Sequence, residues 1–169
     1  MMTITTYSAL WFLPFVLPIC LYVAFTDMRE MRITNQAVLA LGAVFIAIGL
    51  IALPFDVYLW RFAQLAIVLV VGIILNAAGA MGAMGAGDSK FIAVAAPFVA
   101  QGDVRMLIPL FCIIMLASVA AHRLVKHTPL RRLAPHWLSW DQGKKFPMGL
   151  ALASTLACYL ALGLVHGSN

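Results

Sequence analysis

The sequence predicts an all-α, polytopic membrane protein with about six transmembrane helices. Of its 169 residues, 64% are hydrophobic and only 10% are charged, and the mean hydropathy is +1.01. A soluble domain of this length could not keep so much apolar surface away from water. The apolar residues also form repeated runs separated by short polar stretches, which indicates several crossings of a bilayer.

Six apolar runs are candidates for membrane helices, since one crossing takes about 20 residues. They cover residues 8–26, 35–53, 61–80, 89–101, 105–122 and 147–165. The fourth is short, because about 13 residues at 1.5 Å each span roughly 20 Å of a core about 30 Å thick. We therefore expect the glycine-rich segment 79–87 to lie at membrane depth as irregular backbone, which is tolerated only beside protein or a water-filled cavity.

The first run is expected to remain as a helix. No Lys or Arg precedes it, whereas a secretory signal would begin with a positively charged region.

The Lys and Arg residues predict the orientation of the helices. With alternating crossings, one side receives only Arg61 and Arg105, and the other receives Arg29, Arg32, Lys90, Arg123, Lys126, Arg131, Arg132, Lys144 and Lys145. The basic side is expected to be cytoplasmic, so both termini should face outward. The same residues explain the pI of 9.5 without a nucleic-acid partner, and they should favour anionic lipid.

The chain is expected to form one membrane-embedded domain over residues 1–169. The outer connections, at residues 54–60 and around Asp103, are too short to hold a domain, and Asp56 and Asp103 are expected to be ordinary loop residues. The long connection 123–146 is typical of a segment at the headgroup level, with His122 and His127 also interfacial.

The three cysteines, Cys20, Cys112 and Cys158, lie inside predicted helices and form no C-x-x-C motif. They predict helix packing, and no metal site is expected.

Asp27 and Asp88 are the candidate catalytic residues. Both fall at the predicted cytoplasmic boundary, where an ionisable group is costly and often functional. Each also has a simpler interpretation: Asp27 could begin a charged turn before a helix capped by Asn35, and Asp88 could be a helix N-cap after Gly85 and Gly87.

Two neighbouring carboxylates would have a distinct chemistry, because in a poorly hydrated site they would share one proton. The ionised group can take a proton from water while the protonated group polarises a carbonyl, as in aspartic proteases. This chemistry requires neither a metal nor a cofactor.

Three motifs, in this order, resemble those of the type IV prepilin peptidase family, and more closely of its small Flp/Tad-type members. They are Asp-x5-Ile-x-Asn at residues 27–35, Gly-x-Gly-Asp-x-Lys at 85–90 and Lys-x-Pro-x-Gly at 145–149. The Gly-x-Gly-Asp sequence is also shared with the wider group of intramembrane aspartic proteases.

The resemblance implies that Asp27 and Asp88 are catalytic and that Asn35, Gly85, Gly87 and Lys90 support them. It does not indicate a role for Lys145, Pro147 and Gly149. It also implies cleavage, after a glycine, of the short basic leader of prepilins or pseudopilins at the cytoplasmic face of the bacterial inner membrane, in association with pilus or secretion machinery. Larger members carry an insertion with paired C-x-x-C motifs and also N-methylate the product; since this chain lacks both motifs, we expect proteolysis alone.

Two other functions remain open at this point. A small proton-coupled transporter could use the two aspartates as a relay. A non-enzymatic assembly factor could use them only as helix caps. Among the other polar residues, Glu30 is expected to be solvated, and Asn76 could bind the acids or pack between helices.

Overall fold

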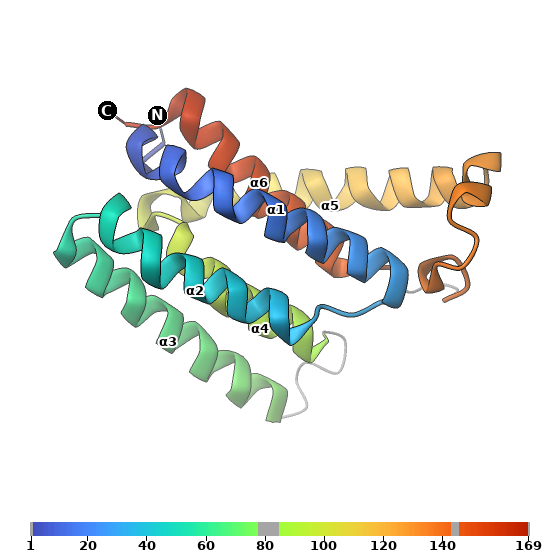
Figure 1. Ribbon diagram of the computed structural model, residues 1–169, viewed down its shortest axis with the longest axis horizontal. Helices are drawn as coiled ribbons and strands as arrows, with labels where there is room; N and C mark the ends of the chain where they lie inside the picture. The colour runs from blue at the N-terminus through green and yellow to red at the C-terminus, as the bar shows by residue number, and fades with distance from the viewer. Residues whose placement is uncertain (1, 78–84, 143–145, 169) are drawn as a thin grey trace.

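The computed structural model describes residues 2–77, 85–142 and 146–168, and it shows six α-helices that alternate in direction (Figure 1). The helices are α1 (Thr6–Glu30), α2 (Asn35–Ala52), α3 (Phe55–Ala77), α4 (Ala86–Ala95), α5 (Val104–Lys126) and α6 (Met148–His166). Four 3-10 turns join them: η1 (Ala96–Phe98), η2 (Gln101–Asp103), η3 (Pro129–Leu133) and η4 (Leu138–Trp140). No β-strand occurs in the described ranges.

Five helical segments are long and apolar enough to cross a membrane. They are Thr6–Glu30, Asn35–Ala52, Phe55–Gly72, Gln101–Lys126 and Met148–His166. The α4 helix has 10 residues and is even shorter than the sequence predicts. Many large apolar side chains are exposed along the long helices. In water such a surface would promote aggregation, whereas in a bilayer it faces lipid. The prediction of an all-α, polytopic membrane protein is confirmed.

Several predicted boundaries are wrong. The first helix continues to Glu30 instead of ending at residue 26, and the third begins at Phe55, so the expected outer loop 54–60 is mostly helix. The first error arises because backbone hydrogen bonding continues through the polar residues at 26–30, beyond the apolar run. The second has another cause, since residues 55–60 are apolar apart from Asp56 and extend the third run towards the N-terminus. The predicted irregular segment 79–87 lies largely outside the described residues, apart from its last three.

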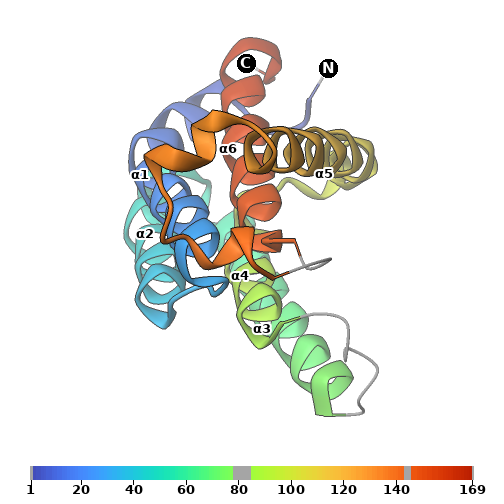
Figure 2. The same cartoon turned by 90° about the vertical axis from the view of Figure 1, so that its right-hand side faces the viewer.

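The centre of the bundle is the contact between α1 and α6. Buried residues of α1 recur every three or four positions, which places them on one face: Ala9, Phe12, Val16, Cys20 and Val23. On α6, a Cβ at Gly163 would lie 3.1 Å from that of Ala9, so the two backbones approach closely. The α2 helix covers α1, and α5 packs mainly against α6 (Figure 2).

Both termini lie at one end of the bundle, and the C-terminal end of α1 lies at the other (Figure 1). Thr5 and Ser168 form an isolated parallel bridge, with hydrogen bonds from the Thr6 amide to the Ser168 carbonyl and from the Ser168 amide to the Ile4 carbonyl. The chain therefore completes an even number of passages along the bundle.

Asp103 is not the ordinary loop residue that we expect from the sequence. It is buried beside the two termini and accepts hydrogen bonds from the Thr3 amide at 2.6 Å, the Ile4 amide at 2.9 Å and the Tyr159 hydroxyl at 2.8 Å. The Tyr159 oxygen in turn accepts from the Ala100 amide at 3.0 Å. Asp103 therefore ties the N-terminal segment to α6 and to the start of α5.

Candidate active site

Asp27 lies within the last turn of α1, not after the helix, and it is only 4% exposed. The α6 helix begins after Pro147, which supplies no capping side chain. Instead the Leu150 amide donates a hydrogen bond to Oδ2 of Asp27 at 3.2 Å. Asp27 thus satisfies an amide in the first turn of α6, as a cap within the same helix would normally do.

Gly149 lies directly against this carboxyl group. A Cβ at Gly149 would lie 2.9 Å from Cγ and from Oδ2 of Asp27, and 2.9 Å from Cγ1 of Ile33. Any larger residue would displace the carboxyl group or the helix that holds it. This contact gives part of the Lys-x-Pro-x-Gly motif a structural role, and Pro147 is the N-cap residue of the same helix. Lys145 lies outside the described residues.

Asp88 occupies the first turn of α4, and Gly85 is the N-cap residue. The alternative interpretation of Asp88 as the N-cap is therefore wrong. Asp88 is the third residue after the cap, and its Oδ2 accepts a hydrogen bond from the Gly85 amide at 3.2 Å, which is one half of a capping box. Asp88 lies outside the five candidate spans, and burial raises the pKa of its carboxyl group above the usual aspartate value, opposed by this hydrogen bond.

The fold brings the two aspartates together from helices far apart in the sequence. Their carboxyl groups are close enough to interact electrostatically. Ile33, in the turn between α1 and α2, contacts the start of α4, which carries Asp88, and the start of α6, which binds Asp27. A Cβ at Gly87 would lie 3.3 Å from the Ile33 Cβ, and a Cβ at Gly149 would lie 2.9 Å from the Ile33 Cγ1. The Asp-x5-Ile-x-Asn and Gly-x-Gly-Asp motifs thus meet in space, and the start of α6 joins them.

Asn35 and Lys90 also meet, although Asn35 is not the helix cap that the sequence suggests. Thr34 is the N-cap residue of α2, and its hydroxyl accepts the Ala37 amide at 3.3 Å. This leaves the Asn35 side chain free to accept a hydrogen bond from Lys90 Nζ at 3.2 Å. The contact joins the start of α2 to α4, two residues after Asp88.

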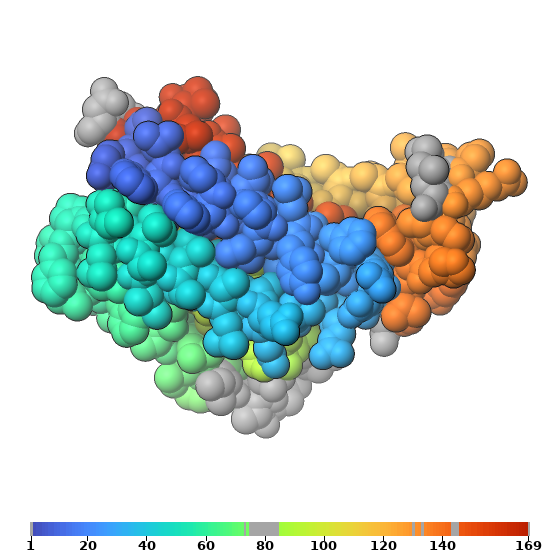
Figure 3. Space-filling model, in the orientation of Figure 1, coloured from blue at the N-terminus to red at the C-terminus, as the bar shows by residue number. Residues whose placement is uncertain are grey.

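The connection after α5 folds against the same end of the bundle. Ring contacts run from Phe25 of α1 to Trp137, from Trp137 to Trp140, and from Trp140 to His122, with centroids 5.8, 5.7 and 4.9 Å apart. His122 is buried beside Trp140, and its interfacial position stays a prediction. The segment projects beyond the helices at this end (Figure 3).

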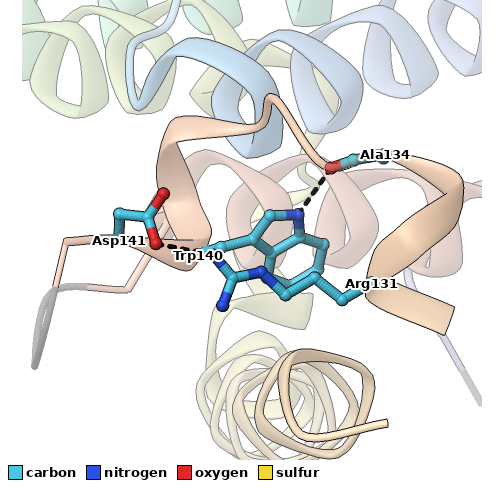
Figure 4. Close-up of polar contacts among 4 residues, drawn as sticks. All are labelled: Arg131, Ala134, Trp140 and Asp141. Atoms are coloured by element: carbon cyan, nitrogen blue, oxygen red, sulfur yellow. Dashed lines mark hydrogen bonds and ion pairs between the residues drawn. The ribbon is translucent and has the colours of Figure 1, made fainter. Parts of the chain in front are cut away.

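Two polar contacts hold this segment in shape (Figure 4). Arg131 forms an ion pair with Asp141 at 2.7 Å, and the Trp140 indole donates to the Ala134 carbonyl at 2.8 Å. Sequence reasoning missed this arrangement, because the aromatic residues follow no helical or strand period. Its only signal in the sequence is the presence of two tryptophans, Trp137 and Trp140, in this long connection.

The remaining polar candidates from the sequence are Asn76 and the three cysteines. The Asn76 side chain lies outside the described part of the chain. Cys20 is buried in α1, whereas Cys112 and Cys158 are exposed on their helices. Within the described ranges, no three His, Cys, Asp or Glu side chains are grouped so as to hold a metal ion.

A comparison with protein families relates the chain to a known family. The model of the type IV leader peptidase family matches residues 14–125, which is more than half of the chain and includes Asp27, Asn35 and the 85–90 motif. Neither a curated protein nor a solved structure matches the chain.

Proposed function

Because the chain belongs to the type IV leader peptidase family, we propose that it is an aspartic endopeptidase whose catalytic residues are Asp27 and Asp88. The observation that supports this most strongly is the electrostatic interaction between these two carboxyl groups, which belong to α1 and α4. Both lie at the helix ends that carry most of the basic residues.

In the proposed mechanism the pair holds one proton. The ionised carboxylate takes a proton from a water molecule as the water oxygen attacks the scissile carbonyl carbon, and the protonated carboxyl group gives its proton to the carbonyl oxygen. The tetrahedral intermediate then collapses as the C–N bond breaks. The carboxyl group that took the proton from water gives it to the leaving amine, and the other carboxylate recovers its proton from the intermediate. The pair therefore returns to its starting state.

The proposed substrate is the precursor of a type IV, Flp-type pilin or pseudopilin, cleaved behind its short basic leader. Its own apolar helix would enter from the bilayer, and the leader would lie along the cytoplasmic face near Asp27 and Asp88. This orientation follows from the distribution of Lys and Arg, with both termini outward. Since the sequence has no C-x-x-C motif, we propose cleavage without N-methylation.

The proposed pair predicts a bell-shaped dependence of rate on pH. At low pH both groups are protonated and no base remains, and at high pH both are ionised and no acid remains. Since burial raises the pKa of Asp88, the pair keeps its proton above the ordinary aspartate pKa of about 3.9, so the alkaline limb should lie above that value.

The test is cleavage of a prepilin with a glycine-terminated leader by the purified protein in detergent, beside Asp27→Asn and Asp88→Asn. Asparagine keeps an oxygen that can accept the Leu150 or Gly85 amide, so both variants should fold. Loss of cleavage in both folded variants, with wild-type activity unaffected by EDTA, is the expected result.

Three other results would count against parts of the proposal. Full activity in either variant would exclude the two-aspartate mechanism. No cleavage of several prepilins by folded wild-type protein would favour the proton-relay alternative, which a flux assay in vesicles would then examine. Methylated product by mass spectrometry would overturn the expectation of proteolysis alone.

A further inference from the structure

Ile33 occupies an unusual position between the two helix starts that hold the aspartates. It lies in the short turn between α1 and α2 and is 7% exposed. Its Cβ lies where a Gly87 side chain would extend, and its Cγ1 lies where a Gly149 side chain would extend. Ile33 thus separates α4 from α6 at this end of the bundle, with its Cβ and backbone towards α4 and its Cγ1 towards α6.

Each of these two helix starts holds one carboxyl group in place. Asp88 immediately follows Gly87 in α4, and Asp27 is bound to the Leu150 amide, which immediately follows Gly149 in α6. A change in the distance from Ile33 to either glycine therefore moves one carboxyl group relative to the other. The glycines leave no side chain of their own to absorb such a change.

We propose that Ile33 is a positioning residue that sets the separation of the Asp27 and Asp88 carboxyl groups. This inference rests on the proposed two-aspartate function. Ile33 carries no proton and takes no part in bond making. It acts as a rigid spacer, since a β-branched side chain has few accessible rotamers. The separation decides how strongly the groups share a proton, and so the pH range in which one is ionised and the other protonated.

A purely structural role for Ile33 predicts a different result. In that case truncation would lower the thermal stability of the protein but leave the kinetics of the folded fraction unchanged. The two roles can therefore be separated by measuring kcat, KM and the pH–rate profile below the unfolding temperature.

The experiment compares Ile33→Val, Ile33→Ala and Ile33→Leu with Leu41→Ala. Valine keeps Cβ and Cγ1, the atoms that face the two glycines, and should retain activity within about threefold. Alanine removes Cγ1, and we expect kcat to fall by at least about tenfold, because misplacement of reacting groups by 1 Å can cost about 100-fold. KM should remain within about twofold. The pH interval between the acid and alkaline limbs of the rate profile should change.

Leu41→Ala is the matched control, because it also removes three side-chain carbon atoms, here from a fully buried residue of α2. It should lower the unfolding temperature without moving the pH profile. If Ile33→Ala does not fold, Ile33→Leu provides the measurement: it keeps the side-chain volume but loses the β-branch, and it should also lower kcat and alter the profile.

Unchanged kcat and pH profile in whichever of Ile33→Ala and Ile33→Leu folds would overturn the spacer role while leaving the peptidase intact. Failure of the peptidase assignment would appear separately, as an inactive wild type or an active Asp27→Asn.

Discussion

At the scale of single residues, the two aspartates share a structural feature as well as a proposed chemistry. Each accepts a hydrogen bond from a backbone amide at the start of a helix. The donor to Asp27 is Leu150 in α6, and the donor to Asp88 is Gly85, the cap of α4. The N-terminus of a helix favours a negative charge nearby. Helix capping and catalysis are therefore not exclusive interpretations of these residues, since the amide that holds a carboxyl group also orients it.

Gly149 offers the clearest single substitution. In Gly149→Ala the new Cβ would approach Asp27 to 2.9 Å, so the carboxyl group must move. A displacement of this kind should reduce kcat/KM for prepilin cleavage by on the order of 100-fold. Gly42→Ala is the control, because its Cβ would meet only Val94 Cγ1, at an ordinary 3.9 Å. Equal activities of the two alanine variants would contradict the placement of Gly149 against Asp27.

At the scale of elements, α4 depends on its neighbours for its position. It is too short to cross a bilayer alone and packs against α3, α2 and α6. Near its start, the hydrogen bond from Lys90 to Asn35 joins it to α2, next to the turn that carries Ile33. Asn35 and Lys90 belong to different sequence motifs, and their hydrogen bond forms one junction between α2 and α4.

This junction can be examined with a double-mutant cycle of Lys90→Met and Asn35→Ala. An exposed hydrogen bond is worth about 1 kcal/mol, which corresponds to roughly a fivefold change in rate if all of it acts on the transition state. We expect each single variant to lose activity by about that factor and the double variant to lose little more. Lys126→Met removes the same charge from the end of α5 and should leave cleavage unchanged. Fully additive losses would contradict the contact.

At the scale of the whole molecule, the two ends of the bundle have different tasks. One end brings Asp27 and Asp88 together. The other joins both termini through Asp103, while buried Arg61 donates to the Pro97 carbonyl at 3.3 Å. Buried polar groups at that end are largely satisfied by one another, so we infer that they hold the bundle rather than react.

Asp103 should therefore affect stability and not catalysis. Asp103→Ala would leave the Tyr159 hydroxyl and two backbone amides without their acceptor, at a cost of about 1–3 kcal/mol for an unsatisfied group. Asp56→Ala, at an exposed position in the first turn of α3, should have a much smaller effect. Thermal unfolding in detergent measures both. Lost cleavage in Asp103→Ala at temperatures where it remains folded would contradict this division.

Composition and hydropathy were sufficient for the coarse architecture. Apolar runs of helical length predict the long helices, because a bilayer requires every backbone polar group to be paired within its segment. The same reasoning could not locate helix ends, because caps depend on local hydrogen bonds: Thr34 rather than Asn35 caps α2, and Gly85 rather than Asp88 caps α4. It also could not distinguish exposed Asp56 from buried Asp103, because both lie in short connections on the same predicted side.

The sequence by itself determined the class of protein, its all-helical fold and the two aspartates worth testing, because hydropathy, charge and short motifs are local properties. Only the tertiary structure decided which distant groups meet: Asp27 with the start of α6, Ile33 with Gly87 and Gly149, and Lys90 with Asn35. These contacts join residues from different helices, so their geometry depends on how the helices pack, which no local pattern specifies.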